Sequence, residues 1–148
     1  MIRLEAEPFD AGVELASFAA SAPGAGAIAS FVGLVRCESG GRDVSGLELQ
    51  HYPGLTEKTL AAIAADARAR FELTSLVIVH RYGAMEPGEP IVFVAAAAAH
   101  RRAAFDAVDY MMDLLKTEAA FWKREHGPQG PRWIEARAAD LDDRARWG

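Results

Sequence analysis

Apolar and charged residues alternate in short stretches of the first half of the chain, which predicts β-strands there. Residues 2–6 alternate Ile and Leu with charged residues and predict a first strand that ends before Pro8. Residues 27–36 are mostly apolar and predict a buried strand, in which Gly33 marks a bulge or a close backbone approach. Residues 44–52 alternate and predict a half-exposed strand that pairs with the preceding one.

Apolar residues at helical spacing predict three helices. Asp10 is expected to cap a helix over residues 11–20. Residues 56–71 predict a second helix and residues 101–116 a third, each with one apolar stripe. The two stripes consist of Leu60, Ile63, Ala64, Ala67 and Phe71, and of Ala104, Val108, Met111 and Leu115.

The remaining segments complete the predicted architecture. Continuous apolar runs at residues 76–81 and 91–98 predict two buried strands, joined by a link rich in Gly and Pro. Residues 37–43 contain two glycines and predict a flexible turn or an open loop, and residues 132–137 predict an extended piece before a charged end that can be helical. This order of elements predicts an α+β fold, with a mixed or antiparallel sheet covered by helices in one domain over residues 1–148.

Composition and charge restrict the class of protein. Half of the 148 residues are hydrophobic and a quarter are charged, which is typical of a globular domain. The net charge of −5 argues against general nucleic-acid binding, which requires a positive field. Cys37 is the only cysteine and the four histidines lack ligand spacing, so neither a disulfide nor a metal site is expected. The absence of a secretory leader and the shortness of the longest apolar run, residues 91–99, predict a cytoplasmic protein without a membrane span.

Basic residues gather at both ends of the third predicted helix. The helix begins at His100, Arg101 and Arg102 and ends at Lys116. Cations at a helix N-terminus oppose the helix dipole, and a bound anion removes this conflict. Taken alone, the arginines have the simpler interpretation of a solvated pair, and a lysine in the last turn complements the dipole.

Further basic positions strengthen the case for an anion site. Lys123 and Arg124 follow the aromatic residues Phe121 and Trp122, and Arg36 follows a buried strand. Each has an ordinary explanation, as an exposed strand face or a strand end. The combination that favours a shared site for a small anion is Arg36, His100, Arg101, Lys116 and Lys123. Glycine-rich phosphate loops and a local Ser-His-Asp signature are absent from the sequence.

Several strings of the sequence resemble the large, catalytic subunit of molybdopterin synthase. The most specific string is Phe121-Trp122-Lys123-Arg124-Glu125. The other strings are residues 31–36, 49–58, 79–83, 87–88, 99–101, 115–117 and 132–136. They occur in the same order over nearly the whole chain, so the resemblance covers the predicted domain.

The resemblance implies a fold, partners and a reaction. Members of this family have an α/β hammerhead-type fold and form a homodimer. A small ubiquitin-like sulfur-carrier subunit docks at each end of the dimer to give a heterotetramer, and its C-terminal Gly-Gly tail, a thiocarboxylate, enters the large subunit's pocket. Two sulfurs are placed on cyclic pyranopterin monophosphate to make molybdopterin, a step of molybdenum cofactor biosynthesis. The resemblance implies no cofactor for the enzyme itself.

The resemblance also implies site residues. Lys116 matches a catalytic lysine expected to contact the carrier's terminal carbonyl and the reacting carbon, as general acid/base or transient nucleophile. Lys123 matches a second catalytic lysine expected to stabilise developing negative charge, and the division of roles between the two stays open. The positions that match substrate contacts are Leu34, Val35, Arg36, His100, Arg101, Arg124 and Glu125.

Two positions and one segment depart from the family pattern. Ala120 stands where proline is usual, and Leu34 stands where a polar or basic residue is frequent. Residues 37–41 replace a more polar segment after Arg36. None of these departures removes a matched catalytic residue.

Two other functions are compatible with the residues. A non-catalytic scaffold would bind a ubiquitin-like tail without turnover, although the intact Lys116, Lys123 and Arg36 speak against it. An unrelated phosphate-ester or nucleotide binder would use the same cationic patch without preferring a pterin. Composition and periodicity alone support only an α+β domain with an anion-binding patch.

Overall fold

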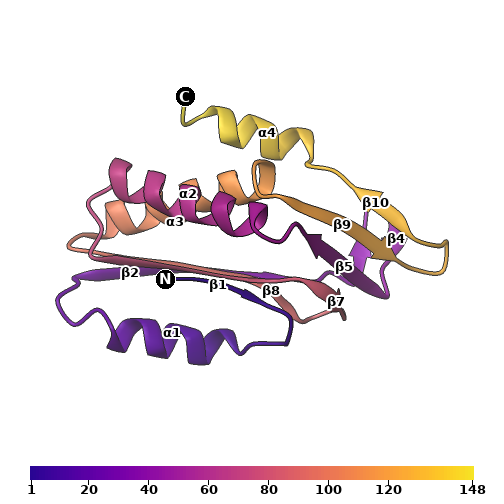
Figure 1. Cartoon of the computed structure of the whole chain (residues 1–148), viewed down its shortest axis with the longest axis horizontal. Helices are drawn as coiled ribbons and strands as arrows, with labels where there is room; N and C mark the ends of the chain where they lie inside the picture. The colour runs from indigo at the N-terminus through magenta and orange to yellow at the C-terminus, as the bar shows by residue number, and fades with distance from the viewer.

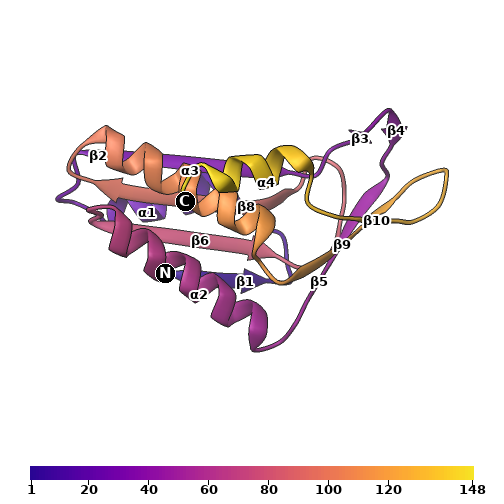
Figure 2. The same cartoon turned by 90° about the horizontal axis from the view of Figure 1, so that it is seen from above.

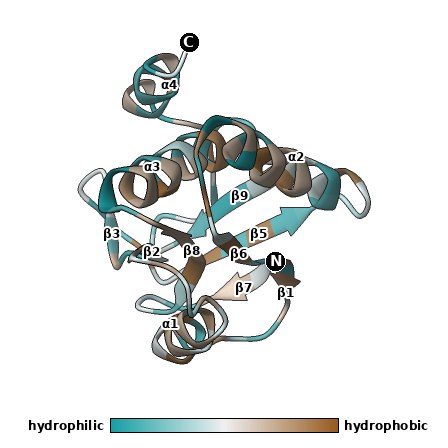
Figure 3. Cartoon of the chain, turned by 90° about the vertical axis from the view of Figure 1, so that its left-hand side faces the viewer, coloured by the Kyte–Doolittle hydropathy of each residue, from teal (hydrophilic) through white to brown (hydrophobic).

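A four-stranded sheet with helices on both faces forms the larger part of the molecule. The computed structural model describes all residues, 1–148. This first sheet has the order β1 (Ile2–Glu5), β6 (Ser75–Arg81), β8 (Pro90–Ala98) and β2 (Ala27–Leu34), and only the β1–β6 pair is parallel. Helix α1 (Ala11–Ala20) covers one face, and α2 (Leu55–Arg70) and α3 (Arg101–Thr117) cover the other (Figure 1, Figure 3).

Alternation along β6 explains why both faces of the first sheet are covered. Leu76 and Ile78 belong to the main core beneath α2 and α3, whereas Val77 and Val79 belong to a smaller cluster with Phe18 of α1. A strand buried on both faces requires a continuous apolar run, and such runs predicted both central strands. The three predicted helices are also confirmed, each within about one residue of its expected bounds. None of the helices combines the length and apolar character that spanning a bilayer requires.

A second four-stranded sheet lies at one end of the first (Figure 1, Figure 2). Its order is β10 (Arg132–Ile134), β9 (Phe121–His126), β5 (Gly46–His51) and β7 (Gly83–Met85), and every pair is antiparallel. The sequence did not predict β7, which lies in the link between the two central strands. Together the two sheets and the helices confirm the predicted α+β class.

The predicted pairing of residues 44–52 with residues 27–36 was wrong. β5 pairs with β7 and β9, and β2 pairs only with β8. The physical reason is packing, because Leu49 of β5 is buried against Val35 and Met85 at the end of the first sheet. This arrangement leaves the outer edge of β2 without a neighbouring strand.

Residues 37–43 form a short hairpin, which agrees with the predicted turn and not with the predicted open loop. β3 (Glu38–Ser39) and β4 (Arg42–Asp43) pair in antiparallel fashion. Gly40 and Gly41 between them have φ values of 59° and 77°. Two central residues with positive φ form the tight turn whose twist matches a hairpin, and glycine adopts this conformation without strain.

Helix α4 (Ala138–Ala145) brings the end of the chain back over α3 (Figure 1). Asp113 of α3 accepts hydrogen bonds from Arg146 Nη2 at 2.9 Å and from Trp147 Nε1 at 2.6 Å. The ring of Trp147 packs edge-on against Tyr110, with 5.4 Å between the ring centroids. These contacts hold α4 in place, although the helix buries none of its own residues.

Candidate active site

A cavity of about 450 Å³ lies where the two sheets meet. Its wall comes from segments far apart in the sequence, namely β2 and the residues after it, parts of β6 and β8, the end of α3, strands β5 and β9, and the segment from β10 into α4. The ionisable residues in the wall are Arg36, His80, Lys116, Lys123, Glu125, Glu135, Arg137 and Asp140. Apolar side chains such as Val35, Leu49 and Leu115 line the rest. A cavity of this size suits one small organic ligand.

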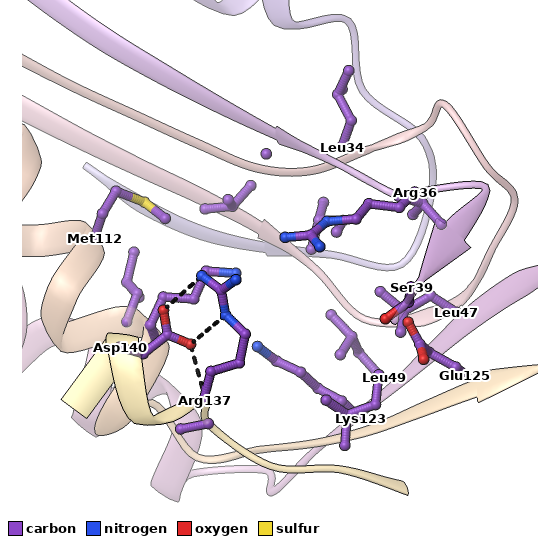
Figure 4. A pocket seen from close by; sticks show the side chains of 18 of the residues that line it. Leu34, Arg36, Ser39, Leu47, Leu49, Met112, Lys123, Glu125, Arg137 and Asp140 are labelled. Carbon is purple, nitrogen blue, oxygen red and sulfur yellow. Dashed lines mark hydrogen bonds and ion pairs between the residues drawn. The ribbon is translucent and has the colours of Figure 1, made fainter. Parts of the chain in front are cut away.

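A bulge at the end of β2 turns the chain into the cavity. The register with β8 shifts between Gly33 and Leu34, and a Cβ on Gly33 would lie only 2.9 Å from Val92 Cγ1. The prediction of a bulge or close approach at Gly33 is therefore confirmed. Beyond the bulge Val35 is buried, and the guanidinium of Arg36 points into the cavity (Figure 4).

Strand alternation gives β9 a cavity face and an outer face. Lys123 and Glu125 line the cavity, whereas Trp122 and Arg124 do not. On the outer face Arg124 Nη2 donates a hydrogen bond to Glu48 Oε1 at 2.9 Å. Of the residues matched as substrate contacts, Arg124 therefore lies behind the cavity wall.

Glu125 is fixed in the wall by a neighbouring arginine. Arg132 Nη2 of β10 donates to Glu125 Oε1 at 2.7 Å and lies 3.5 Å from Ser39 Oγ of the short hairpin. The guanidinium of Arg132 thus links strands β3, β9 and β10 on this side of the cavity. The negative charge of Glu125 is already paired before any ligand binds.

Both cavity lysines have lowered pKa values. The pKa of Lys123 is lowered to about 8, mainly by burial and also by the charge of Lys116, while Asp140 opposes the shift. Burial is also the main cause that lowers the pKa of Lys116; Asp140 raises it, and Arg137 and Arg36 lower it. Lys123 is the more enclosed of the two, since Lys116 stays exposed at the open side of the cavity.

His80 forms an uncharged part of the cavity wall. Its ring stacks on Phe121 with 4.1 Å between centroids, and Nδ1 lies 2.9 Å from the carbonyl oxygen of Arg81. A carbonyl oxygen only accepts, so Nδ1 carries the proton. The pKa of His80 is lowered to about 4, mainly by burial, with a smaller contribution from the charges of Lys123 and Lys116. The sequence indicated only a strand end here, and no signal in it pointed to the cavity.

Sequence reasoning missed three charged residues that line the cavity: Glu135, which lies in a family string but was given no site role, and Arg137 and Asp140. Figure 4 shows Arg137 and Asp140 side by side, across the cavity from Arg36. Arg137 Nη2 lies 3.3 Å from Asp140 Oδ1, and Arg137 Nε lies 3.4 Å from Asp140 Oδ2. The charged end of the chain has no apolar pattern that would have directed these residues inward, and the family strings ended at residue 136.

His100 and Arg101 do not meet the other cations within one chain. They stand at the start of α3, whereas Lys116 stands at its end. At about 1.5 Å per residue the helix separates the two positions by roughly 20 Å. The structure thus brings together Arg36, Lys116 and Lys123 and leaves His100 and Arg101 at the far end of α3.

The cavity can hold an anion or stabilise a charge that develops during a reaction. Arginines supply permanent positive charge, and a lysine with a pKa of about 8 can exchange a proton near neutral pH. No group of three or more His, Cys, Asp or Glu side chains is arranged to hold a metal ion. The cavity wall combines permanent cations and a lysine that can exchange a proton with partly apolar surroundings.

Comparisons with known proteins identify the family to which the chain belongs. The family model described as "MoaE protein" matches residues 4–118. The molybdopterin synthase catalytic subunit of Pseudomonas aeruginosa is 53% identical over 146 residues, which cover 99% of this chain and 97% of that protein. The corresponding subunit of Caulobacter vibrioides is 52% identical over 147 residues, with 99% and 97% covered.

Solved structures share the whole fold. The molybdopterin biosynthesis MoaE protein of Burkholderia ambifaria superposes with a TM-score of 0.84 at 47% identity, covering 100% of this chain and 97% of that chain. A Helicobacter pylori chain shares the fold with a TM-score of 0.75 at 20% identity, covering 93% and 90%. The chain therefore belongs to the MoaE family of molybdopterin synthase catalytic subunits, enzymes of molybdenum cofactor biosynthesis.

Proposed function

We propose that this chain transfers sulfur from the C-terminal thiocarboxylate of a small ubiquitin-like carrier subunit to cyclic pyranopterin monophosphate. The observation that carries this proposal is the gathering of Arg36, Lys116, Lys123 and Arg137 around one partly apolar cavity. The substrate phosphate and the thiocarboxylate are both anions, and bringing them together costs Coulomb energy unless cations lie near both. Cations in a partly dry wall reduce that cost more than exposed cations do.

The arginines suit the phosphate of the substrate. A guanidinium is always charged and can bind two phosphate oxygens at once. Arg36 and Arg137 reach the cavity from different segments of the chain, and Figure 4 shows both guanidinium groups directed into it. We assign the neighbouring Leu34 and Val35 to the substrate-facing wall.

The lysines suit the reacting end. The thiocarboxylate sulfur attacks a substrate carbon and forms a C–S bond, while a C–O bond at that carbon breaks and the departing oxygen takes a proton from a lysine ammonium. Water then cleaves the carrier's thioester, which leaves sulfur on the substrate and a carboxylate on the carrier. With its pKa of about 8, Lys123 is suited to the proton transfer. Lys116 stabilises negative charge on the carrier's terminal carbonyl, and a second carrier repeats the step.

A second copy of the chain supplies His100 and Arg101 in this proposal. β2 is an edge strand that exposes apolar side chains, among them Phe31 and Val32. Ala27, at the start of β2, pairs with Ala98 and so lies close to His100. The other end of β2 leads into Arg36 at the cavity. Two copies that pair antiparallel through β2 therefore place His100 and Arg101 of one chain beside the cavity of the other.

The carrier completes the assembly. The Helicobacter pylori chain that shares this fold was solved as a complex of subunits 1 and 2 of molybdopterin-converting factor. By the same arrangement, one carrier docks on each protomer, with its tail in the cavity, and gives a heterotetramer. The whole chain acts as one domain in this assembly, and we place the reaction in the cytoplasm.

Reconstitution with thiocarboxylated carrier and cyclic pyranopterin monophosphate tests the proposal, with molybdopterin as the readout. Lys116→Ala and Lys123→Ala are each expected to lower kcat by about 100-fold or more, because an acid or charge-stabilising group in the transition state contributes at least that much. Lys58→Ala, at an exposed position of α2, is the matched control and keeps full activity.

Three outcomes contradict the proposal. Full activity of Lys116→Ala would exclude the assigned role of that residue. Carrier binding without product in the unaltered protein would identify a scaffold. Calorimetry in which nucleotides bind as tightly as the pterin phosphate would identify a general phosphate-ester site.

A further inference from the structure

Asp140 makes three contacts with one residue at the mouth of the cavity. Its Oδ2 accepts a hydrogen bond from the backbone N of Arg137 at 3.1 Å and lies 3.4 Å from Arg137 Nε, and its Oδ1 lies 3.3 Å from Arg137 Nη2 (Figure 4). The Asp140 side chain is 13% exposed, whereas that of Arg137 is 63% exposed. The carboxylate is thus the enclosed member of the pair and the guanidinium is the accessible one.

We infer that Asp140 is a positioning residue of the active site, whose carboxylate holds Arg137 over the cavity and offsets part of the positive charge of Lys116 and Lys123. This inference rests on the proposed function. It adds Asp140, which lies outside the strings that resemble the family. Asp140 itself need not touch the substrate, because it acts through the three cations.

The contacts of Arg137 support the positioning role. Asp140 is its only side-chain partner in the structure, so the direction of the guanidinium depends on this one carboxylate. Arg137 is also the residue from which α4 begins, and Asp140 accepts the backbone N–H that the first turn leaves free. The same carboxylate therefore fixes both the start of the helix and the side chain that this turn presents to the cavity.

The charges around the lysines support the second part of the role. The ionisable neighbours that line the cavity with Lys116 and Lys123 are Arg36, His80, Glu125, Glu135, Arg137 and Asp140. Glu125 is paired with Arg132, and His80 is neutral because burial lowers its pKa to about 4. Asp140 is the carboxylate whose charge raises the pKa of both lysines against the effect of burial.

The carboxylate stays charged over the working range of pH. Burial alone would raise the pKa of Asp140, but the hydrogen bonds and the charge of Arg137, together with Lys116, lower it overall. Replacing Asp140 by Asn keeps the side-chain shape and one oxygen acceptor while removing the charge. The lysines of Asp140→Asn should then lose their protons at lower pH than in the unaltered protein.

The test measures the lysines directly, without sulfur transfer. The unliganded protein is treated with an amine-acylating reagent across a pH series, and modification of Lys116 and Lys123 is followed by mass spectrometry. In Asp140→Asn the midpoint of the reactivity curve should move to lower pH, and in Asp140→Glu it should return toward the unaltered value. Asp142→Asn, on the exposed side of the same helix, is the matched control and should leave the curve unchanged.

Reconstituted turnover tests the positioning of Arg137. Asp140→Asn should raise KM for the pterin phosphate by about 10-fold, a loss of the size expected when a bound group shifts slightly, and Asp140→Glu should recover most of it. If the curves of lysine reactivity against pH are the same for Asp140→Asn and the unaltered protein, Asp140 does not offset the charge of the lysines. Equal losses in the Asn and Glu variants would show a purely structural role and overturn the positioning. Shifted curves in a protein that makes no molybdopterin would refute the proposed function alone.

Discussion

The chemistry available to Lys123 is determined by the strand that carries it. Its neighbours in sequence, Trp122 and Arg124, lie on the outer face of β9, and alternation alone directs Lys123 into the cavity. Burial there lowers its pKa to about 8. The sequence identified Lys123 through its place in the string of residues 121–125. Its pKa, however, depends on the cavity wall, which is formed by segments elsewhere in the chain.

The pH dependence of turnover should report this lysine. Its ammonium loses its proton as the pH rises through about 8, so a reaction that needs the charged form should slow above that pH. Lys123→Arg keeps a permanent charge but is a much weaker acid, so its maximal rate should be lower and the alkaline decline should be absent. The measurement is kcat across pH 6.5 to 9.5, about 1.5 units either side of the expected midpoint. An identical decline in both proteins would assign it to another group.

His80 should make the fold sensitive to acid. Its pKa in the folded state is about 4, below the value of 6.5 for a free histidine. The unfolded state therefore binds more protons between these values, and the free energy of unfolding falls as the pH drops from about 6.5 to about 4, by about 3 kcal/mol. Urea unfolding at several pH values should show this slope, and His80→Gln should flatten it. An equally steep slope in the variant would place the effect at other residues.

At the scale of elements, the anchor of α4 lies away from the cavity that the helix helps to close. Trp147 packs against Tyr110 and donates to Asp113, while Arg137 stands at the other end of α4. α4 buries no residue of its own, and besides these terminal contacts it is held by Arg144, whose Nε donates to Glu118 Oε1 at 2.7 Å. The anchor therefore couples the last turn of the chain to the position of an active-site cation.

Trp147→Ala should loosen α4 without unfolding the protein. Loss of one half-buried indole should lower the free energy of unfolding by about 1–2 kcal/mol, and it should raise amide hydrogen exchange over residues 138–145. Turnover should fall through a higher KM, because Arg137 is no longer held in place. Leu141→Ala, which removes an exposed side chain of α4, is the control. Unchanged exchange in Trp147→Ala would show that other contacts hold the helix.

Elements with a local signal were predictable, and those that depend on distant partners were not. The apolar stripe of residues 56–71 predicted a helix, and the apolar runs 76–81 and 91–98 predicted strands. In each segment the apolar residues by themselves indicate which faces are buried. The partners of β5 were mispredicted, since nothing in its alternation distinguishes β2 from β9. Arg137 and Asp140 were missed for the same reason, as only the return of α4 over α3 brings them to the cavity.

At the scale of the whole molecule, one chain holds an incomplete set of the predicted contacts. Arg36, Lys116 and Lys123 share the cavity, and Arg101 lies at the far end of α3. The unpaired edge of β2 runs between these two places. The proposed dimer through this edge would bring residues from opposite ends of α3 together at one site.

Mixed dimers test whether the site is shared. Lys116→Ala and Arg101→Ala should each be inactive alone. When the two are unfolded together, mixed and refolded, half of the dimers carry one of each chain, and each of these has one intact site, so about a quarter of the unaltered activity should return. No recovery from the mixture would mean that each chain uses its own Arg101. Arg102→Ala mixed with Lys116→Ala provides the comparison for an adjacent arginine.

The open edge of β2 also affects how the protein behaves when it is dilute. An exposed, apolar edge strand is a template for unwanted strand addition, and here no Pro or Lys interrupts residues 27–34. Where another copy is the only cover for that edge, mass action uncovers it at low concentration. Such a protein is expected to be best protected from aggregation in concentrated solution, and most exposed to it early in synthesis, before a second chain is available.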